Sequence, residues 1–369
     1  MSRRVSVRYL GLFASIMFLL VAGGLVIAGP ANAQSKFNHP GNILITDQFN
    51  NRVIEIDPAG NIVWQFGSGP GNTTANVIIG TNDAERVGTL TLMSGTGIPS
   101  GVTTHCKKFG CADNRVLLVD QRGNIVWQYG QFGVTGFGPN QLNTPVQNTY
   151  LPSSGNVLIT DQGNERIIEV RRSDNSIVWQ YGTNGVVGNG PNQLSNPNAA
   201  ELLPGLNGNI LISDENNNRV IEVTHTTPST IVHTYTQAGG VPFSGVAFAS
   251  RLPNGHTLIT DSNNSRIVET DEDGDVFWQY ITNTRAGSNS APLPTRAVRL
   301  ANGDTLISDQ FNHQVIRVDM SVMSGMSGVI VASYGTINSP GFSPSTAIEM
   351  NGPYSAYVIG DYTGITPPF

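Results

Sequence analysis

Residues 47 to 67 read DQFNNRVIEIDPAGNIVWQFG, and related stretches return along the chain. Regular copies occupy residues 161–182, 214–236, 261–281 and 309–335. A divergent copy, CADNRVLLVDQRGNIVWQYG, occupies residues 111–130. All four tryptophans fall at one position of this repeat: Trp64, Trp127, Trp179 and Trp278. Self-similarity of this kind indicates a repeat architecture in which each copy is one structural unit.

Each unit is predicted to contain four β-strands. Stretches such as GNILITD (41–47) and GDTLISD (303–309) alternate apolar and polar residues after a turn glycine, which predicts a strand. A further strand precedes each of them and carries a small residue: Ala84, Asn148, Ala200, Ala249, Ala297 and Ala356. The sequence therefore predicts an all-β, six-bladed β-propeller of four-stranded antiparallel blades, with small residues near the axis and tryptophans on the outer strands.

The ends of the chain predict how the ring closes. The first unit begins at its second strand, and PYSAYVIGD (353–361) supplies the missing innermost strand. We expect the C-terminal strand to complete the first blade, so that residues 34–369 form one propeller domain.

Residues 1–33 are predicted to be an export signal. They combine the basic Arg3 and Arg4, an apolar stretch over 10–28, and Ala31-Asn32-Ala33 as a cleavage site. The alternatives left open are an uncleaved membrane anchor and a twin-arginine rather than a general export route. After cleavage no stable membrane span remains, which predicts a secreted, periplasmic or cell-surface protein.

The two cysteines and the low content of charged residues limit the kinds of site that the protein can carry. Cys106 and Cys111 lie in HCKKFGC, and an oxidising compartment favours a disulfide between them over a metal site with His105. Charged residues make up only 12% of the chain and the net charge is -6, so no basic face is available for nucleic acid.

The repeated core D-x-x-N-x-R-[VI] resembles the NHL repeat, whose members form six-bladed propellers. The ending GNIVWQYG also resembles the repeats of PQQ-like, quinone-binding propellers and of bacterial arylsulfotransferases. These resemblances imply the fold more strongly than any activity. Because the motif recurs in nearly every blade, we interpret it mainly as a structural turn that ties neighbouring blades together.

Two sets of polar residues are candidate sites. The aspartates that end the second strands are predicted to ring one mouth of the channel, where they would hold calcium or another divalent cation: Asp47, Asp161, Asp214, Asp261 and Asp309. Polar residues that differ between blades are predicted to line the channel and to bind a polar small molecule, unless they only pair neighbouring blades: Asp83, Glu85, Gln147, Glu201, Arg251, Arg296 and His313.

These features favour an exported NHL-like scaffold that binds an unidentified protein or polar small molecule. The alternative is a metal-dependent, lactonase-like hydrolase or lyase with its site at the carboxylate-lined mouth. An arylsulfotransferase-like enzyme would use His313 as its catalytic histidine. The histidines are scattered rather than clustered, which favours the scaffold over an enzyme.

Overall fold

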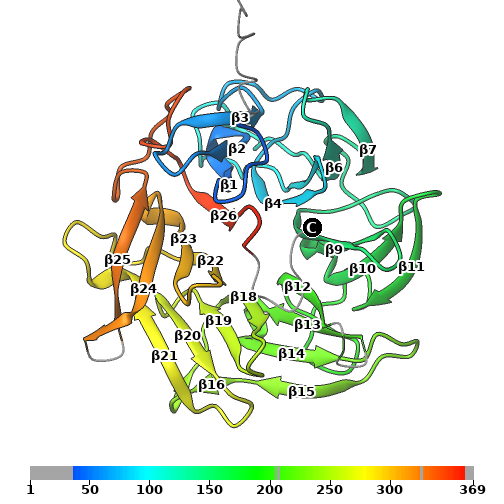
Figure 1. The fold of residues 1–369 in the computed structure, drawn as a ribbon. Coiled ribbons are helices and arrows are strands. Elements are labelled where there is room, and N and C mark those ends of the chain that lie inside the picture. Colours follow the sequence, from blue (N-terminus) through cyan, green and yellow to red (C-terminus); the bar gives the residue numbers. More distant parts are fainter. Residues whose placement is uncertain (1–35, 204, 206–207, 325–326, 362–369) are drawn as a thin grey trace, which may run out of the picture. The chain divides into compact units, whose positions relative to one another are not determined.

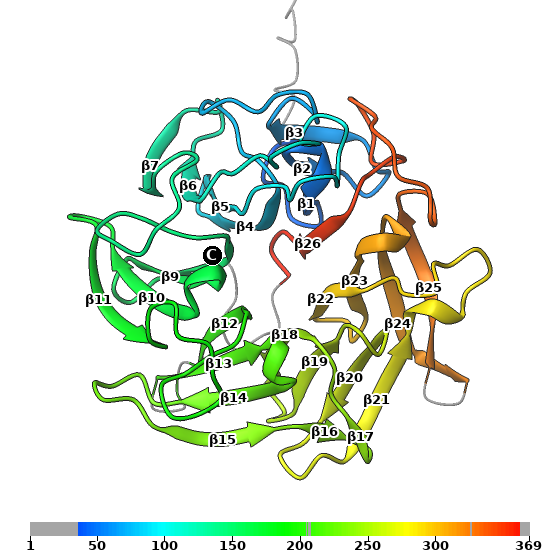
Figure 2. The same cartoon turned by 180° about the vertical axis from the view of Figure 1, so that it is seen from behind.

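The structure is a computed structural model that describes residues 36–361, except 204, 206–207 and 325–326. The predicted signal peptide, residues 1–33, lies outside this range. Within it, six four-stranded antiparallel sheets are arranged around a central axis, as Figures 1 and 2 show from opposite sides. The predicted six-bladed propeller is confirmed. No helix in the described residues is long and apolar enough to cross a membrane.

Blades 1 to 3 each run from an innermost to an outermost strand. Their strands are, for blade 1, β26 (Pro353–Val358), β1 (Ile43–Asp47), β2 (Arg52–Ile56) and β3 (Ile62–Phe66); for blade 2, β4 (Thr81–Val87), β5 (Leu90–Gly95), β6 (Arg115–Val119) and β7 (Ile125–Gly130); and for blade 3, β8 (Pro145–Leu151), β9 (Asn156–Asp161), β10 (Arg166–Arg171) and β11 (Ser176–Tyr181).

Blades 4 to 6 follow the same order. Their strands are, for blade 4, β12 (Pro197–Leu203), β13 (Asn209–Asp214), β14 (Arg219–Val223) and β15 (Ile231–Tyr235); for blade 5, β18 (Val246–Arg251), β19 (Thr257–Asp261), β20 (Arg266–Thr270) and β21 (Val276–Ile281); and for blade 6, β22 (Pro294–Arg299), β23 (Thr305–Asp309), β24 (Gln314–Ser324) and β25 (Ser327–Tyr334). A short ribbon, β16 (Gln237–Ala238) with β17 (Val241–Pro242), lies between blades 4 and 5 in sequence.

The C-terminal strand closes the ring as predicted. β26 pairs with β1 in antiparallel register, with Ala356 opposite Ile45. The Thr46 hydroxyl accepts a hydrogen bond from the Ser355 amide over 2.8 Å. In Figure 1 the red β26 lies beside the blue β1, so both ends of the domain belong to one sheet.

The small residues lie on the innermost strands and the tryptophans on the outermost strands, as the repeat predicted. Ala84 lies opposite Met93 and Ala200 opposite Ile212, so the small residues occupy equivalent places on the innermost strands. Trp64 and Trp179 lie on outermost strands opposite glutamates of the third strand. Their buried faces add to apolar clusters between strands, which stabilise the ring because apolar area is removed from water.

Candidate binding site

The Asp-x-x-Asn-x-Arg motif forms one closed polar unit, seen clearly in blade 3. Asp161 Oδ2 accepts hydrogen bonds from Asn164 Nδ2 and Arg166 Nε, each over 2.7 Å. Asp161 Oδ1 accepts the backbone amide of Asn143, which belongs to the connection entering the blade, over 2.8 Å. Asp161 and Arg166 are buried. The motif therefore fastens the incoming connection to the turn that follows the second strand.

The same unit recurs in the other regular blades. The Arg Nε to Asp Oδ2 distances are 2.7 to 2.8 Å for three further pairs: Arg52 with Asp47, Arg219 with Asp214, and Arg266 with Asp261. In the divergent blade the aspartate has moved closer in sequence, and Arg115 Nε donates to Asp113 over 2.5 Å. Burial raises the pKa of Asp47, Asp113, Asp161 and Asp214 although a guanidinium lies beside each.

Blade 6 keeps this ion pair although it lacks the arginine of the motif. Gln314 stands at the arginine position, and Arg285 reaches in from the connection before the blade. Its guanidinium donates to Asp309 Oδ2 over 2.5 Å and to Gln314 Oε1 over 2.8 Å. Burial raises the pKa of Asp309 to about 6. A guanidinium from another segment has thus replaced the one missing from the repeat.

The five aspartates predicted as a cation ring are each bound within their own blade. Their oxygens face the arginine and asparagine of the same turn, or the arginine that substitutes for it. In the described part of the chain no group of three or more His, Cys, Asp or Glu side chains is placed to hold a metal ion. In the described residues these aspartates are therefore not brought together into one carboxylate site, and the cation stays a prediction.

In blades 1, 3, 4 and 6 the residue after the aspartate, which the sequence analysis did not single out, contacts a neighbouring blade. Gln310 Nε2 donates to Gln48 Oε1 over 2.7 Å, and Gln48 Nε2 donates to Asn82 Oδ1 over 2.8 Å. These contacts join blades 6, 1 and 2. The sequence carried a signal for these contacts. The position after the repeated aspartate is polar in every regular blade but differs between blades: Gln48, Gln162, Glu215, Ser262 and Gln310.

His313 occupies a structural position that is asparagine in blades 1, 2 and 4, as Asn51, Asn114 and Asn218. Asn51 Oδ1 accepts the amide of Gly80 over 2.9 Å at the entrance to the next blade. His313 Nδ1 accepts the amide of Gly352 over 3.1 Å in the same way, where the ring closes. Its backbone is left-handed, as is that of Asn51. Burial lowers the pKa of His313 to about 4, which keeps the ring neutral and able to accept.

Four of the predicted channel residues come together at the axis. Arg296 Nη2 lies 3.3 Å from Asp83 Oδ1, and its guanidinium lies 4.3 Å from the centre of the Phe248 ring. Burial raises the pKa of Glu201 to about 8, which Arg296 opposes. Burial and the charge of Asp83 raise the pKa of Glu85 well above its usual value. Near neutral pH the Arg296–Asp83 pair therefore lies beside a Glu201 carboxyl that is largely protonated.

The other two predicted channel residues pair neighbouring blades, as the alternative interpretation held. Gln147 Oε1 accepts the amide of Ala200 over 2.6 Å, which joins blade 3 to blade 4. Arg251 donates to Glu222 over 3.1 Å and to Tyr235 over 3.0 Å, which joins blade 5 to blade 4.

Side chains also cross the axis near its mouth. Tyr354 of blade 1 is hydrogen-bonded to Asn198 of blade 4, over 3.0 Å from its hydroxyl to Oδ1. Asn198 Nδ2 lies 2.9 Å from Glu215 Oε2. Because blades 1 and 4 stand opposite each other in a six-bladed ring, this chain of contacts spans the channel at this level.

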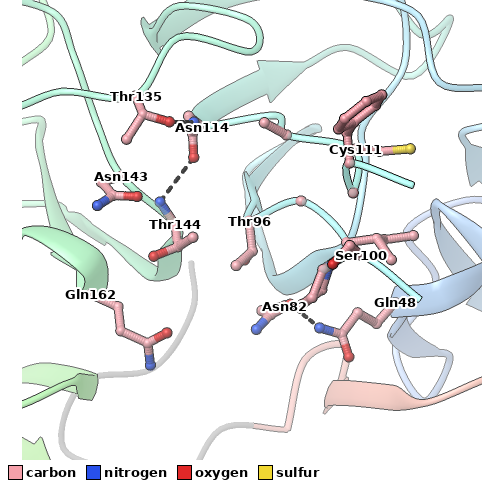
Figure 3. Close-up of a pocket in the computed structure, with 16 residues that line it drawn as sticks. Gln48, Asn82, Thr96, Ser100, Cys111, Asn114, Thr135, Asn143, Thr144 and Gln162 are labelled. Atoms are coloured by element: carbon pink, nitrogen blue, oxygen red, sulfur yellow. Dashed lines mark hydrogen bonds between the residues drawn. The ribbon is translucent and has the colours of Figure 1, made fainter. Parts of the chain in front are cut away.

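A cavity of about 420 Å³ lies beside this mouth (Figure 3). We call the face that carries it the turn face, because it is formed by the turns between second and third strands and by the connections between blades. Asn143, Thr144 and Gln162 lie on one side of the cavity, and Gln48, Asn82 and Ser100 on the other, as Figure 3 shows. Its wall also includes the segment from Thr96 to Ser100 and Phe109 to Ala112.

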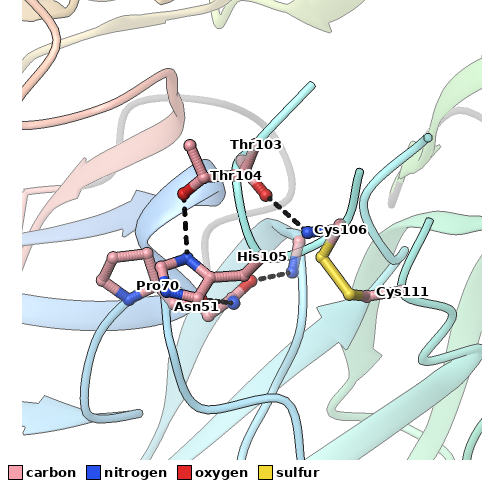
Figure 4. Close-up of a disulfide and its surroundings, with 8 residues drawn as sticks. Asn51, Pro70, Thr103, Thr104, His105, Cys106 and Cys111 are labelled. Carbon is pink, nitrogen blue, oxygen red and sulfur yellow. Dashed lines mark hydrogen bonds between the residues drawn. A yellow bond between two sulfur atoms is a disulfide. The ribbon is translucent and has the colours of Figure 1, made fainter. Parts of the chain in front are cut away.

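The disulfide predicted between Cys106 and Cys111 is present and shapes this wall (Figure 4). It closes a hairpin whose base is a pair of backbone hydrogen bonds between Ile98 and Cys111, each over 2.8 Å. The Cys106 amide donates to Thr103 Oγ1 over 3.3 Å. At the tip Phe109 is 85% exposed. The cross-link therefore holds an exposed aromatic ring at the edge of the cavity.

Residues 112–331 match the model of a protein family described as outer membrane protein assembly factor BamB. The chain belongs to this family. The BamB match covers more than half of the chain and runs from just before β6 of blade 2 into β25 of blade 6. No curated protein matches the sequence.

Solved structures similar to this BamB family member are distant from it in sequence. A protein of unknown function from Bacteroides caccae is 16% identical with a TM-score of 0.52, covering 79% of this chain and 94% of that chain. Virginiamycin B lyase from Staphylococcus aureus is 16% identical with a TM-score of 0.48, covering 81% and 82%. At such identity the likeness to the Bacteroides protein shows the fold alone.

Proposed function

We propose that this protein is an exported binding scaffold that engages a partner through its turn face. The observation that carries the proposal is the cavity of about 420 Å³ on that face, whose volume falls in the range of ligand-binding sites. In the channel, by contrast, Arg296 is paired with Asp83, and Arg251 is paired with Glu222. Membership in a family described as an outer membrane protein assembly factor supports a role outside the cytoplasm that is exercised through protein contacts.

Exposed apolar side chains on the same face support this role. They lie in the disulfide hairpin and in the two glycine-rich connections of blades 2 to 4: Val102, Phe109, Val134, Phe137, Val186 and Val187. Exposed apolar side chains in connecting segments are suited to contacts with a partner. The two connections also share a rigid internal order, since Gln141 and Gln193 each accept a glycine amide over 3.2 Å.

No observation in the described residues favours the metal-dependent hydrolase or the sulfotransferase, and we propose neither. The aspartates needed for the first are bound to arginines, and His313 is bound in the ring closure. The closer resemblance to NHL repeats, the export signal and the route of export remain predictions.

Site-specific cross-linking tests the proposal. A photoreactive residue at Val187, which is 64% exposed on the turn face, is compared with one at the exposed Ser153, in the β8–β9 turn on the opposite face. Cells of the source organism are irradiated and the purified products are compared. We expect saturable, discrete products from Val187 alone. Equal products from both positions, or products from Ser153 alone, would contradict the proposal.

A further inference from the structure

We propose that the turn-face cavity binds a neutral saccharide, with hydroxyl groups held by amide side chains and one sugar face laid on Phe109. This inference rests on the proposed function, because it names a ligand class for the same face.

The lining of the cavity is polar but uncharged. All sixteen described residues around it lack an ionisable acid or base, and nine of them carry a side-chain amide or hydroxyl: Gln48, Asn82, Thr96, Ser100, Asn114, Thr135, Asn143, Thr144 and Gln162. Amides and hydroxyls both donate and accept, which suits the hydroxyls of a sugar. A charged ligand would lose hydration here without gaining an opposite charge.

Several of these groups have hydrogen-bonding capacity left for a ligand. Among the described contacts the Thr144 and Ser100 hydroxyls have no partner, and Asn143 uses its Nδ2 alone, donating to Gly163 O over 2.8 Å. Gln162 uses only its Nε2, at 3.5 Å from Glu215. In Figure 3 Asn143, Thr144 and Gln162 lie on the same side of the space. These three uncharged side chains can therefore form hydrogen bonds with a ligand.

An aromatic ring at the rim supplies the apolar half of the recognition. Pyranose rings have C–H groups on their faces and hydroxyls around their edges, so they pack on aromatic rings while their edges form hydrogen bonds. Phe109 is 85% exposed and is held on a hairpin by the Cys106–Cys111 disulfide. The Lys108 ammonium lies 5.0 Å from the ring centre, and this exposed side chain is free to move aside. Because the disulfide constrains the hairpin backbone that carries this ring, less of the chain has to be ordered on binding.

Blade 3 departs from the repeat at the position that shapes this wall. The second residue after the aspartate is Phe49, Asn216, Asn263 or Phe311 in the other regular blades but is Gly163 here. A Cβ at this position would lie 2.6 Å from Asn143 Cγ and 2.7 Å from Thr144 Oγ1. The glycine thus leaves Asn143 and Thr144 in the positions from which they line the cavity.

Calorimetric titration and saturation-transfer NMR of the purified mature protein test the assignment. The probes are trisaccharides of glucose and of N-acetylglucosamine, with galacturonic acid and glucosamine trimers as charged comparators and neutral tripeptides as a separate class. We expect at least one neutral trisaccharide to bind with a Kd below about 1 mM, and the charged comparators to bind at least about tenfold more weakly.

Variants locate the binding. Phe109→Ala is expected to raise Kd by about tenfold by removing the aromatic surface. Gly163→Asn, which restores a residue of the repeat, is expected to weaken binding because it displaces Asn143 and Thr144. Phe137→Ala is the matched control, because this 56% exposed phenylalanine is on the same face but does not line the cavity, and its Kd should equal that of the wild type.

The possible failures are distinguishable. Absence of neutral-saccharide binding below about 10 mM, tighter binding of charged comparators or of peptides, or an unchanged Kd in Phe109→Ala would overturn the saccharide assignment. Cross-linking from Val187 would still support the turn face as the binding face. If cross-linking also failed, the proposed function itself would fall.

Discussion

Replacing Arg166 by methionine tests whether the repeated motif is a buried, mutually dependent ion pair. Methionine keeps most of the apolar stem and removes the charge, which leaves the buried carboxylate of Asp161 without its 2.7 Å partner. Removing one partner of a buried pair costs about 3–5 kcal/mol. With an unfolding entropy of about 2.1 cal/mol/K per residue over roughly 330 residues, this corresponds to a fall in Tm of about 4–7 °C.

The pH dependence of the unfolding free energy shows whether the variant is destabilised by an unpaired buried carboxylate or only by lost packing. Burial already raises the pKa of Asp161, and loss of the guanidinium should raise it further. A carboxyl whose folded-state pKa is raised gains stability as pH falls through that pKa. The stability deficit of Arg166→Met relative to the wild type should therefore shrink between pH 7 and pH 5. Urea unfolding curves at several pH values measure it.

Two matched variants complete this test. Arg171→Met in the same blade breaks an ion pair with Asp174 that is about half exposed, 50% and 51%, and should cost less than about 1 kcal/mol. The double variant Asp161→Asn with Arg166→Met removes both charges and should recover at least about 2 kcal/mol of the loss. A loss below about 1 kcal/mol in the single variant, or a deficit that does not change with pH, would refute the reasoning.

Four further predictions follow from the other contacts. Arg285→Met should destabilise blade 6 by about 3 kcal/mol in urea unfolding, and adding Gln314→Arg should restore most of it; no rescue would contradict the substitution of one guanidinium for the other. His313 has a pKa of about 4 in the fold against 6.5 unfolded, so stability should be lost by up to about 3 kcal/mol as pH falls from 6.5 to 4, and His313→Asn should abolish that component; equal pH profiles for both proteins would disprove it. Truncation after Asn351 removes the closing strand and should yield an aggregating protein without a cooperative transition. Chelator should leave Tm unchanged, because the aspartates are already bound by arginine and amide groups, and a reversible fall in Tm restored by calcium would show a site that this bonding does not explain.

Much of the blade architecture followed from local sequence pattern. Alternation in GNILITD and its relatives indicated strands, and the tryptophan column identified the outer strand, because both depend on spacing within one unit. The structural interpretation of the Asp-x-x-Asn-x-Arg turn followed from the same logic. The sequence did not predict which backbone amide this turn binds. Asn143 lies in the connection before the blade, outside the repeated pattern that contains Asp161, and the two residues meet only in the folded blade.

The candidate site shows where sequence reasoning stopped. Arg285 donates a hydrogen bond to Asp309 from another segment, and His313 accepts a backbone amide as asparagine does in blade 1. No rule of sequence spacing predicts either contact. The sequence predicted that the aspartates converge, because they recur at one place in each blade. Their side chains instead bind an arginine beside the same turn, which for Asp309 is Arg285 from the preceding connection.

The sequence by itself determined the strand order, the number of blades, the closure by the C-terminal strand and the disulfide, because these depend on periodic side-chain patterns and on short separations along the chain. Only the tertiary structure decided which polar side chains are hydrogen-bonded within the protein and which can still bind a ligand. Burial and pairing depend on groups from different blades, such as Tyr354 with Asn198 across the axis or Gly163 against Thr144. The free energy of a polar side chain depends on all its neighbours, and those neighbours are set by how the ring closes.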